Sequence, residues 1–208
     1  MRHESRRLLI ATGNRGKFEE IDALLGGHGF DLVAQAALGI AEVEETASTF
    51  VENALLKARH AARVSGLPTL ADDSGLLVDA LHGHPGVRSA RFAGGRPDAA
   101  ANNARLLEVL HEVPDQLRTA RFYCVLVLLR TADDPQPLIC EGTWIGAIAR
   151  APRGQNGFGY DPLFFDAVLG ATAAEMDGPT KARVSHRGQA LSALRVRAPE
   201  WFAECASA

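Results

Sequence analysis

The chain has 208 residues, 47% of them hydrophobic, and its 22 basic and 25 acidic side chains give a net charge of −3. This length can bury a core without disulfides or a structural metal, and the charge balance argues against a polymeric nucleic acid as partner. No run approaches the roughly 20 apolar residues that span a bilayer, so we expect no membrane association.

The chain has three cysteines, and no two of them have the Cys-x-x-Cys spacing of a zinc site. An odd number of cysteines also argues against a disulfide framework. Unpaired thiols of this kind are typical of proteins in the reducing cytosol. We therefore expect a cytoplasmic protein with three cysteines that serve as packing residues, namely Cys124, Cys140 and Cys205.

The first predicted unit is a buried strand at residues 8–11, a glycine-rich loop at residues 12–17 and then a helix. Loop amides followed by a helix N-terminus favour an anion such as phosphate, and Lys17 adds a positive charge there. The loop is not a Walker A motif, because only two residues separate Gly13 from Gly16. The alternative is that its glycines serve the backbone turn alone.

A second helix is predicted to begin after Thr49, which forms a capping box with Glu52 three residues later. Its apolar residues share one face, which leaves Thr49, Asn53 and Lys57 together on another face. By itself, a lysine at such a position is more typical of solvated surface than of a functional site.

Two adjacent carboxylates, Asp72 and Asp73, stand between two apolar runs and are followed by Ser74 and Gly75. The pattern predicts a charged turn between two buried strands. Two acids at a strand end are costly to desolvate unless a cation faces them, and Mg²⁺ would suit them through oxygen ligands. The alternative is a turn in which one acid caps the backbone and the other points to water.

The rest of the chain is predicted to form a helix at residues 98–110, two long strands at residues 119–129 and 137–148, and a helical segment at residues 179–199. Near its start this last segment carries Lys181, Ser185, His186 and Arg187. The adjacent imidazole and guanidinium offer donors in fixed planes to the edge of a polar ring.

A glycine-rich loop at residues 153–162 precedes that segment. Its glycines let a flat ligand approach the backbone, Phe158 and Tyr160 offer faces for stacking, and Asp161 supplies an acceptor. The alternative is a connector whose aromatic rings cover the core.

Together these motifs resemble the inosine triphosphate pyrophosphatase family, the non-canonical purine nucleoside triphosphate diphosphatases. The resemblance follows the family's order over almost the whole chain, at residues 12–17, 44–46, 49–58, 71–76, 85–91, 157–162 and 185–191. Two departures are Arg88, where the family commonly has tyrosine, and a less acidic approach to Lys181.

The resemblance implies an α/β fold in which two α/β lobes flank a long mixed central sheet, with a nucleotide cleft between the lobes. It implies one domain over residues 1–208 and a homodimer. It also implies Mg²⁺-dependent hydrolysis of ITP, dITP or XTP to the monophosphate and pyrophosphate, which would clear these nucleotides from the pool.

The resemblance also assigns roles to single residues. By the resemblance, Asp73 would be the catalytic base, and Mg²⁺ is expected on Asp73 with Glu45, or with both Glu45 and Glu44. From charge alone, Lys57 would be a second catalytic residue that neutralises the phosphates, and Asp72 would add to the acid cluster that holds metal. The residues expected to bind the substrate are Thr12, Gly13, Asn14, Arg15, Gly16, Lys17, Ser74, Phe158, Gly159, Tyr160, Asp161, Lys181, His186 and Arg187.

Two other functions remain open from the sequence. A Maf-like pyrimidine nucleotide diphosphatase cleaves the same bond, but residues 157–161 and 185–188 argue against it. A non-catalytic nucleotide-binding regulator is the second alternative, and the presence of both the acids and the lysines argues against that reading.

Overall fold

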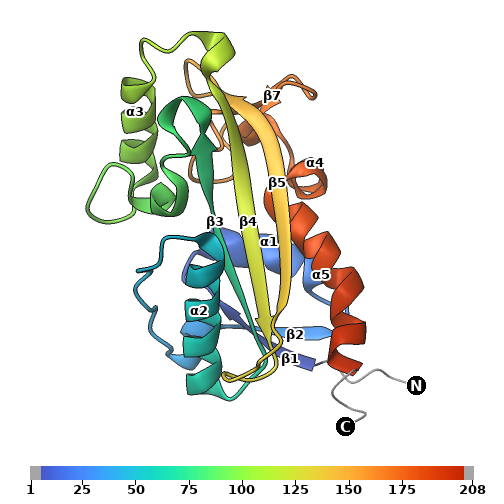
Figure 1. Cartoon of the computed structure of the whole chain (residues 1–208). Coiled ribbons are helices and arrows are strands. Elements are labelled where there is room, and N and C mark those ends of the chain that lie inside the picture. The colour runs from blue at the N-terminus through green and yellow to red at the C-terminus, as the bar shows by residue number, and fades with distance from the viewer. Residues whose placement is uncertain (1–5, 204–208) are drawn as a thin grey trace. The chain divides into compact units, whose positions relative to one another are not determined.

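The computed structural model describes residues 6–203, which divide into two compact units. Unit 1 comprises the described residues up to Asp73, residues 124–142, and the residues from Arg187 onward; unit 2 comprises residues 74–123 and 143–186. The described strands form one mixed sheet in the order β2-β1-β3-β4-β5-β6-β7, and the helices pack beside it (Figure 1). The predicted α/β class with a mixed central sheet is therefore confirmed.

The elements largely follow the predicted boundaries. The strands are β1 (Arg6–Ala11), β2 (Phe30–Ala34), β3 (Thr69–Val78), β4 (Thr119–Leu129), β5 (Leu138–Ile148), β6 (Phe164–Asp166) and β7 (Ala171–Thr172). The α-helices are α1 (Arg15–Leu25), α2 (Phe50–Ser65), α3 (Ala99–Val109), α4 (Gly178–Val184) and α5 (His186–Ala203). None of the helices within residues 6–203 is long and apolar enough to cross a membrane.

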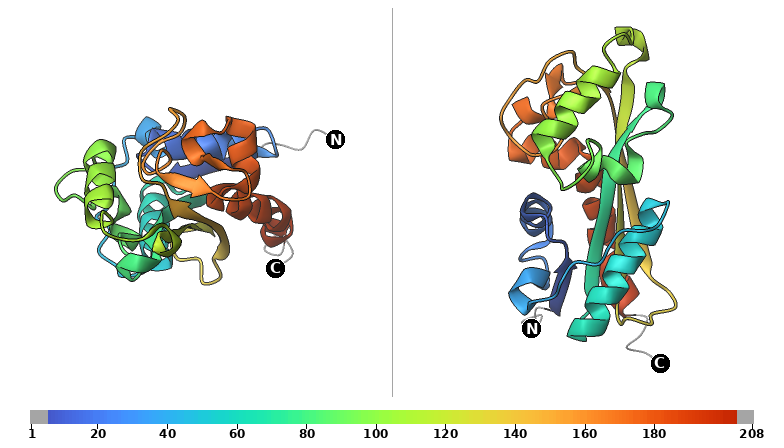
Figure 2. Two further views of the ribbon diagram at one scale, coloured as in Figure 1. Left: turned by 90° about the horizontal axis from the view of Figure 1, so that it is seen from above. Right: turned by 90° about the vertical axis from the view of Figure 1, so that its left-hand side faces the viewer.

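Unit 1 is built on the parallel strands β2, β1 and β3, with β1 in the middle. The chain crosses from β1 to β2 through α1, then returns past β1 to β3 through α2. Right-handed crossovers in opposite directions place their helices on opposite faces of a sheet. Accordingly, α1 and α2 lie on opposite sides of β3 in the right-hand view of Figure 2.

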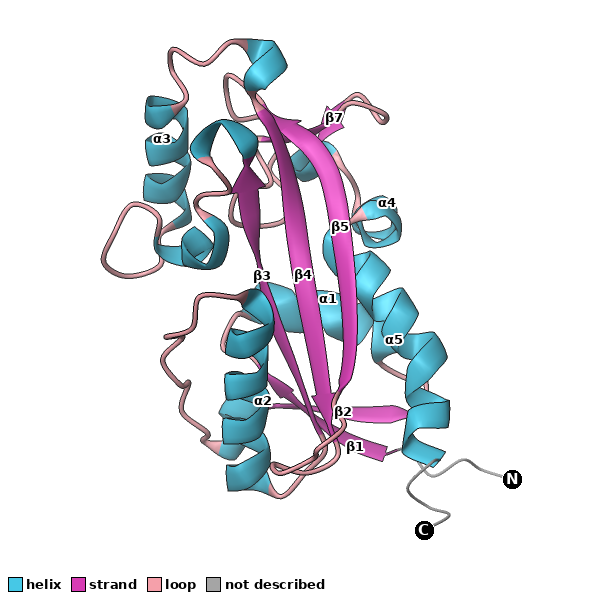
Figure 3. Ribbon diagram, viewed as in Figure 1, coloured by secondary structure: helices cyan, strands magenta, loops and turns pink. Residues whose placement is uncertain are grey.

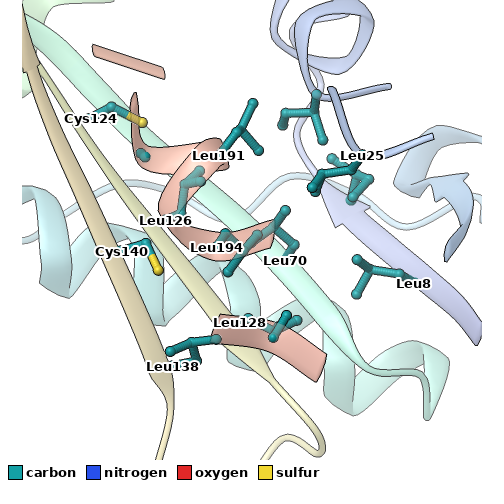
Figure 4. Close-up of a cluster of buried hydrophobic side chains, with 14 of the residues drawn as sticks. Leu8, Leu25, Leu70, Cys124, Leu126, Leu128, Leu138, Cys140, Leu191 and Leu194 are labelled. Carbon is teal, nitrogen blue, oxygen red and sulfur yellow. The ribbon is translucent and has the colours of Figure 1, made fainter. Parts of the chain in front are cut away.

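The core of unit 1 lies on the α1 side of these strands, where α1 and α5 cover them (Figure 4). Its buried side chains include Leu8, Leu25, Leu70, Leu126 and Leu194. The thiols of Cys124 and Cys140 are free and buried in the same core, as predicted for packing cysteines, whereas Cys205 lies outside the described residues.

Unit 2 has a core of its own, formed where α3 packs with the unit 2 parts of β3, β4 and β5. Its largest side chains are aromatic, and Phe122, Trp144 and Phe164 contact one another with ring centroids 4.6 to 6.3 Å apart. Offset and tilted aromatic contacts of this kind add to the stabilisation from buried area.

Two predictions about local structure are wrong. Residues 72–75 form no turn, because β3 runs without interruption from Thr69 to Val78 (Figure 3). The single helical segment expected at residues 179–199 is two helices, α4 and α5, since Ser185 between them is extended with φ −69° and ψ 156°.

The predicted N-cap of α2 at Thr49 is confirmed, but the second bond of a capping box, from the backbone N–H of Thr49 to Glu52, is not formed. Thr49 accepts a hydrogen bond from the backbone N–H of Glu52, and its hydroxyl donates to the Glu52 carboxylate at 2.6 Å. The cap satisfies the N–H of Glu52, which the first helical turn would otherwise leave unpaired, and the bond between the two side chains holds the Thr49 hydroxyl in place.

Replacing Thr49 with alanine removes this cap and should destabilise the protein by about 1 kcal/mol. For a chain of this size that corresponds to a fall in melting temperature of about 2–4 °C. Thr131→Ala is the matched control, because Thr131 is exposed and lies outside any helix. Equal melting temperatures for the two variants in a thermal unfolding experiment would contradict the prediction.

Candidate functional site

The site in unit 1 is organised by the alternation of β3. Successive side chains of a strand point to opposite faces of the sheet, so Asp72 and Asp73 cannot lie on the same face. Asp72 faces the side of α1 and α5, and Asp73 faces the side of α2, as their partners confirm. The two carboxylates expected to act as one acid cluster are therefore separated by the sheet.

On the α2 face, the structure brings together three residues that the sequence singled out. Lys57 donates from Nζ to Oδ1 of Asp73 and to Oε1 of Glu45, both at 2.8 Å. The side chains are 14% exposed for Lys57, 6% for Asp73 and 25% for Glu45. A lysine that looked like solvated surface in the sequence is thus mostly buried between two acids.

Burial and neighbouring charges change the pKa values of Asp73 and Lys57. Burial raises the pKa of the Asp73 carboxyl above its ordinary value, against the opposing charges of Lys57 and Lys17. Burial alone would lower the pKa of Lys57, but the carboxylates of Asp73 and Glu45 outweigh it and hold that pKa above its usual value. The group therefore combines a lysine that stays charged with a carboxylate that is more basic than usual.

The second oxygen of Asp73, Oδ2, is buried and has no hydrogen-bond partner among the described residues. An unpaired carboxylate oxygen beside Glu45 fits a hard cation such as Mg²⁺, which binds through one or two carboxylates and otherwise keeps water and phosphate ligands. Within residues 6–203, no three His, Cys, Asp or Glu side chains gather as a metal centre. Glu44 is exposed and makes no hydrogen bond or ion pair in that part of the chain.

On the other face, Asp72 has a side chain that is completely buried. Its Oδ1 accepts from Lys17 at 2.6 Å, and its Oδ2 accepts from Arg187 at 2.8 Å and from Cys124 at 3.2 Å. Burial would raise the pKa of Asp72, but the charges of Arg187 and Lys17 hold it well below its ordinary value. Since both oxygens are occupied by protein donors, the expectation that Asp72 helps to hold a metal is wrong.

The predicted phosphate loop leaves the sheet next to these acids. Ala11, the last residue of β1, pairs with Ala71 of β3, so residues 12–17 begin beside Asp72 and Asp73. Strand order reverses between β1 and β3, and in open α/β sheets ligands bind at the carboxyl ends of strands at such a point. The loop ends at the N-terminus of α1, where backbone N–H groups favour an anion.

The loop residues have distinct local roles. The side chain of Asn14 caps α1 by accepting from the N–H of Lys17, and Thr12 accepts from the N–H of Asn14 at 3.1 Å. Arg15 is exposed and pairs with Glu19 at 2.6 Å. A Cβ added at Gly13 would lie 1.9 Å from Oε1 of Glu42, the end of an exposed side chain that can move aside.

Unit 2 holds the predicted glycine-rich loop around a second buried ion pair. Oδ2 of Asp161 accepts from Nζ of Lys181 at 2.6 Å and from the N–H of Phe158 at 2.9 Å. The ammonium of Lys181 also lies 5.0 Å from the centre of the Phe158 ring. The Asp161–Lys181 pair, whose members were both predicted to bind substrate, therefore holds the loop at Phe158.

The two aromatic residues of the loop differ in position. Phe158 is half-buried, whereas Tyr160 belongs to the core of unit 2 and its hydroxyl donates to the Ser89 carbonyl at 2.8 Å. The stacking role expected for Tyr160 is therefore wrong, and the alternative of an aromatic that covers the core holds for it. Asn103 in α3 also anchors this loop by donating to the carbonyl of Gly159 at 2.9 Å.

The remaining predicted residues fall on both sides of the unit boundary. His186 belongs to unit 2, is buried and stacks on Phe122 with ring centroids 4.7 Å apart. Arg187 belongs to unit 1, is also buried, and pairs with both Asp72 and Glu20. Ser74 is half-buried in β3.

Sequence reasoning missed Glu20 and Asn103. Glu20 follows Lys17 by three residues and so shares its side of α1, a spacing that could have indicated it. Asn103 gave no such local signal, because its partner lies 56 residues away.

A protein-family model described as the Ham1 family matches residues 8–197. The chain belongs to the Ham1 family. The dITP/XTP pyrophosphatase of Xanthomonas campestris pv. campestris (strain 8004) is 59% identical over 190 residues, which cover 91% of this chain and 96% of that protein. The dITP/XTP pyrophosphatase of Escherichia coli O157:H7 is 55% identical over 188 residues, or 90% and 95% of the two chains.

Solved structures agree with this membership of the Ham1 family. A HAM1 protein from Coxiella burnetii is similar with a TM-score of 0.86 and 47% identity, covering 94% of this chain and 99% of that one. The Staphylococcus aureus Ham1 protein gives a TM-score of 0.82 at 36% identity, with the same coverage. The resemblance found from the sequence motifs is thereby confirmed.

The glycine-rich loop of this Ham1 protein predicts a stability difference between two glycines. Gly157 has φ +73°, and a Cβ there would lie 2.0 Å from Oδ2 of Asp161, the oxygen that Lys181 uses. Gly170 has φ +68° with open space around it. Gly170→Ala should therefore cost only the backbone strain of about 1–2 kcal/mol, and Gly157→Ala clearly more. Urea unfolding of both variants tests this, and equal losses would contradict it.

Tyr160 predicts a loss of stability in alkali. Burial raises the pKa of its phenol well above the ordinary value, so above about pH 10 the unfolded chain releases this proton and the folded chain keeps it. The free energy of unfolding should then fall by up to about 1.4 kcal/mol per pH unit from this group alone.

Tyr160→Phe is the control for that measurement, because it removes the titrating hydroxyl and also the hydrogen bond to Ser89. The variant should be less stable at pH 8, and the difference from the wild type should narrow between pH 10 and pH 12. A constant difference over this interval would show that Tyr160 does not titrate differently in the two states.

Proposed function

We propose that this chain hydrolyses non-canonical purine nucleoside triphosphates, namely dITP, XTP and ITP, to the monophosphate and pyrophosphate. Relatives 55 to 59% identical over at least nine-tenths of the chain are named dITP/XTP pyrophosphatases, which supports the substrate class. The observation that carries the chemistry is Asp73, a buried carboxylate with a raised pKa and one unpaired oxygen beside Lys57.

Asp73 accepts the proton of the attacking water. The water oxygen forms a bond to the α-phosphorus, the bond from that phosphorus to the bridging oxygen breaks, and pyrophosphate leaves with the electron pair. A general base works best when its pKa is near the pH at which it acts, so a carboxyl made more basic by burial suits this step. Lys57, which stays charged, offsets the negative charge near the reacting phosphate.

The triphosphate is bound by residues 12–17 and the N-terminus of α1. Their backbone N–H groups and the ammonium of Lys17 match the charge of the phosphates. Glu45 and Asp73 would hold Mg²⁺, whose charge offsets that of the phosphates and favours the leaving group. In unit 2, the base is the proposed ligand of the loop around Phe158 and of Lys181 and His186.

The first test is a substrate panel. The wild type should release pyrophosphate from dITP, XTP and ITP at least tenfold faster than from ATP or GTP, because a donor placed for a 6-keto oxygen is left unpaired opposite an amino group. UTP or dTTP as the best substrate would instead favour the Maf-like alternative. Tight binding of ITP without any pyrophosphate release would favour a nucleotide-binding regulator.

Asp73→Asn should lower kcat for these substrates by at least about a hundredfold, since the amide cannot accept the proton. The variant should remain folded, because asparagine has nearly the same shape and its amide oxygen can accept from Lys57 as Asp73 does. Circular dichroism and thermal melting check the fold in parallel. Turnover close to that of the wild type would rule out Asp73 as the base.

Magnesium dependence is tested with the two neighbouring glutamates. Chelation of the metal should abolish pyrophosphate release, and added Mg²⁺ should restore it. Glu45→Gln should raise the Mg²⁺ concentration needed for half-maximal rate by at least about tenfold. Glu44→Gln is the matched control and should leave this concentration unchanged, because Glu44 is exposed and makes no hydrogen bond or ion pair within residues 6–203. If Glu44→Gln raised the required Mg²⁺ concentration and Glu45→Gln did not, Glu44 would be the metal ligand instead.

Two further properties belong to the proposal. We propose a homodimer, as the sequence resemblance implies, and light scattering at assay concentration decides it. We also propose a cytoplasmic location, which the free thiols of Cys124 and Cys140 support.

A further inference from the structure

Asp72 lies in unit 1, next to the proposed base in the sequence but on the opposite face of β3. Three elements supply its donors, which are Lys17 of α1, Cys124 of β4 and Arg187 of α5. A buried carboxylate is stable only when its charge is balanced and its lone pairs are used, and these contacts meet both needs. The site thus gives Asp72 no free oxygen with which to contact metal or water.

The charges around Asp72 form an alternating row. Lys17 pairs with Asp72, Asp72 pairs with Arg187, and Arg187 pairs with Glu20. The two inner members are almost fully buried, with side chains 0% exposed for Asp72 and 3% for Arg187, whereas Lys17 is 15% exposed and Glu20 is 26% exposed. The buried pair therefore forms a fixed support, and Lys17 is the cation that reaches the surface from it.

Lys17 needs such a support if it is to act on a phosphate. A lysine side chain is long and flexible, and an ammonium contributes most to a reaction when it is already in place. The loop fixes only the backbone of Lys17, through the Asn14 cap, and the contact with Asp72 fixes the other end of the side chain. The ammonium is thus held at 2.6 Å from Asp72 before any substrate binds.

We propose that Asp72 is a positioning residue for hydrolysis, acting through Lys17, which it holds in place to receive the triphosphate. The inference rests on the proposed function. It differs from a purely structural role for Asp72, in which the ion pairs would stabilise unit 1 without any effect that depends on Lys17.

A double-mutant cycle separates these two roles. The rate of pyrophosphate release from dITP is measured for the wild type, Asp72→Asn, Lys17→Gln and the double variant. Asp72→Asn should lower kcat/KM by about 10- to 100-fold, because a misplaced ammonium no longer meets the phosphate. The double variant should lie within about twofold of Lys17→Gln, since Asp72 has no further effect once the lysine is gone.

Asp134→Asn is the matched control. Asp134 is also a buried aspartate of unit 1 and also pairs with an arginine, Arg130, but it has no contact with Lys17. Its replacement should lower the melting temperature and leave kcat/KM within about twofold of the wild type. The proposal is overturned if Asp72→Asn behaves in the same way, or if the losses from Asp72→Asn and Lys17→Gln multiply in the double variant.

A second measurement covers the case in which Asp72→Asn does not fold. A crystal structure of the wild-type chain with a non-hydrolysable imido analogue of dITP should show Nζ of Lys17 within hydrogen-bond distance of both Asp72 and a phosphate oxygen. A lysine that leaves Asp72 on binding would overturn the proposal. The wild type itself tests the proposed function: if it releases no pyrophosphate from dITP, XTP or ITP, that function fails, whereas an active wild type with an equally active Asp72→Asn refutes only the role of Asp72.

Discussion

The candidate site depends on one geometric constraint, the alternation of side chains along β3. Because β3 continues through Asp72 and Asp73, two neighbouring acids are sent to opposite faces of the sheet. The helices that cross over in opposite directions then supply each face with its own lysine, Lys17 from α1 and Lys57 from α2. Adjacent residues of one type thereby acquire different environments and different chemistry.

The pKa values of the two aspartates move in opposite directions. Burial dominates for Asp73 and raises its pKa, whereas the arginine and lysine beside Asp72 overcome burial and lower its pKa. Two carboxylates whose pKa values are pushed apart in this way are typical of sites where the two groups have different roles. Had both faced the same side, each would have raised the pKa of the other.

Much of the fold and part of the candidate site could be predicted from the sequence, namely where the signal comes from neighbouring residues. The helix cap at Thr49, the loop before α1 and the long strands β4 and β5 follow from spacing and turn chemistry, and the structure confirms them. The error at Asp72 and Asp73 has a physical cause. Asp-Asp-Ser-Gly is good turn chemistry, and what keeps it in a strand is satisfaction of Asp72 by Lys17 and Arg187, which are 55 and 115 residues away.

The contact between Cys124 and Asp72 has a consequence for redox chemistry. Burial and the neighbouring carboxylate raise the pKa of this thiol well above its ordinary value, so almost no thiolate is present at neutral pH. Since peroxides and alkylating reagents attack the thiolate, Cys124 is chemically inert in the folded chain. The carboxylate that secures Lys17 therefore has beside it a sulfur that oxidants leave untouched.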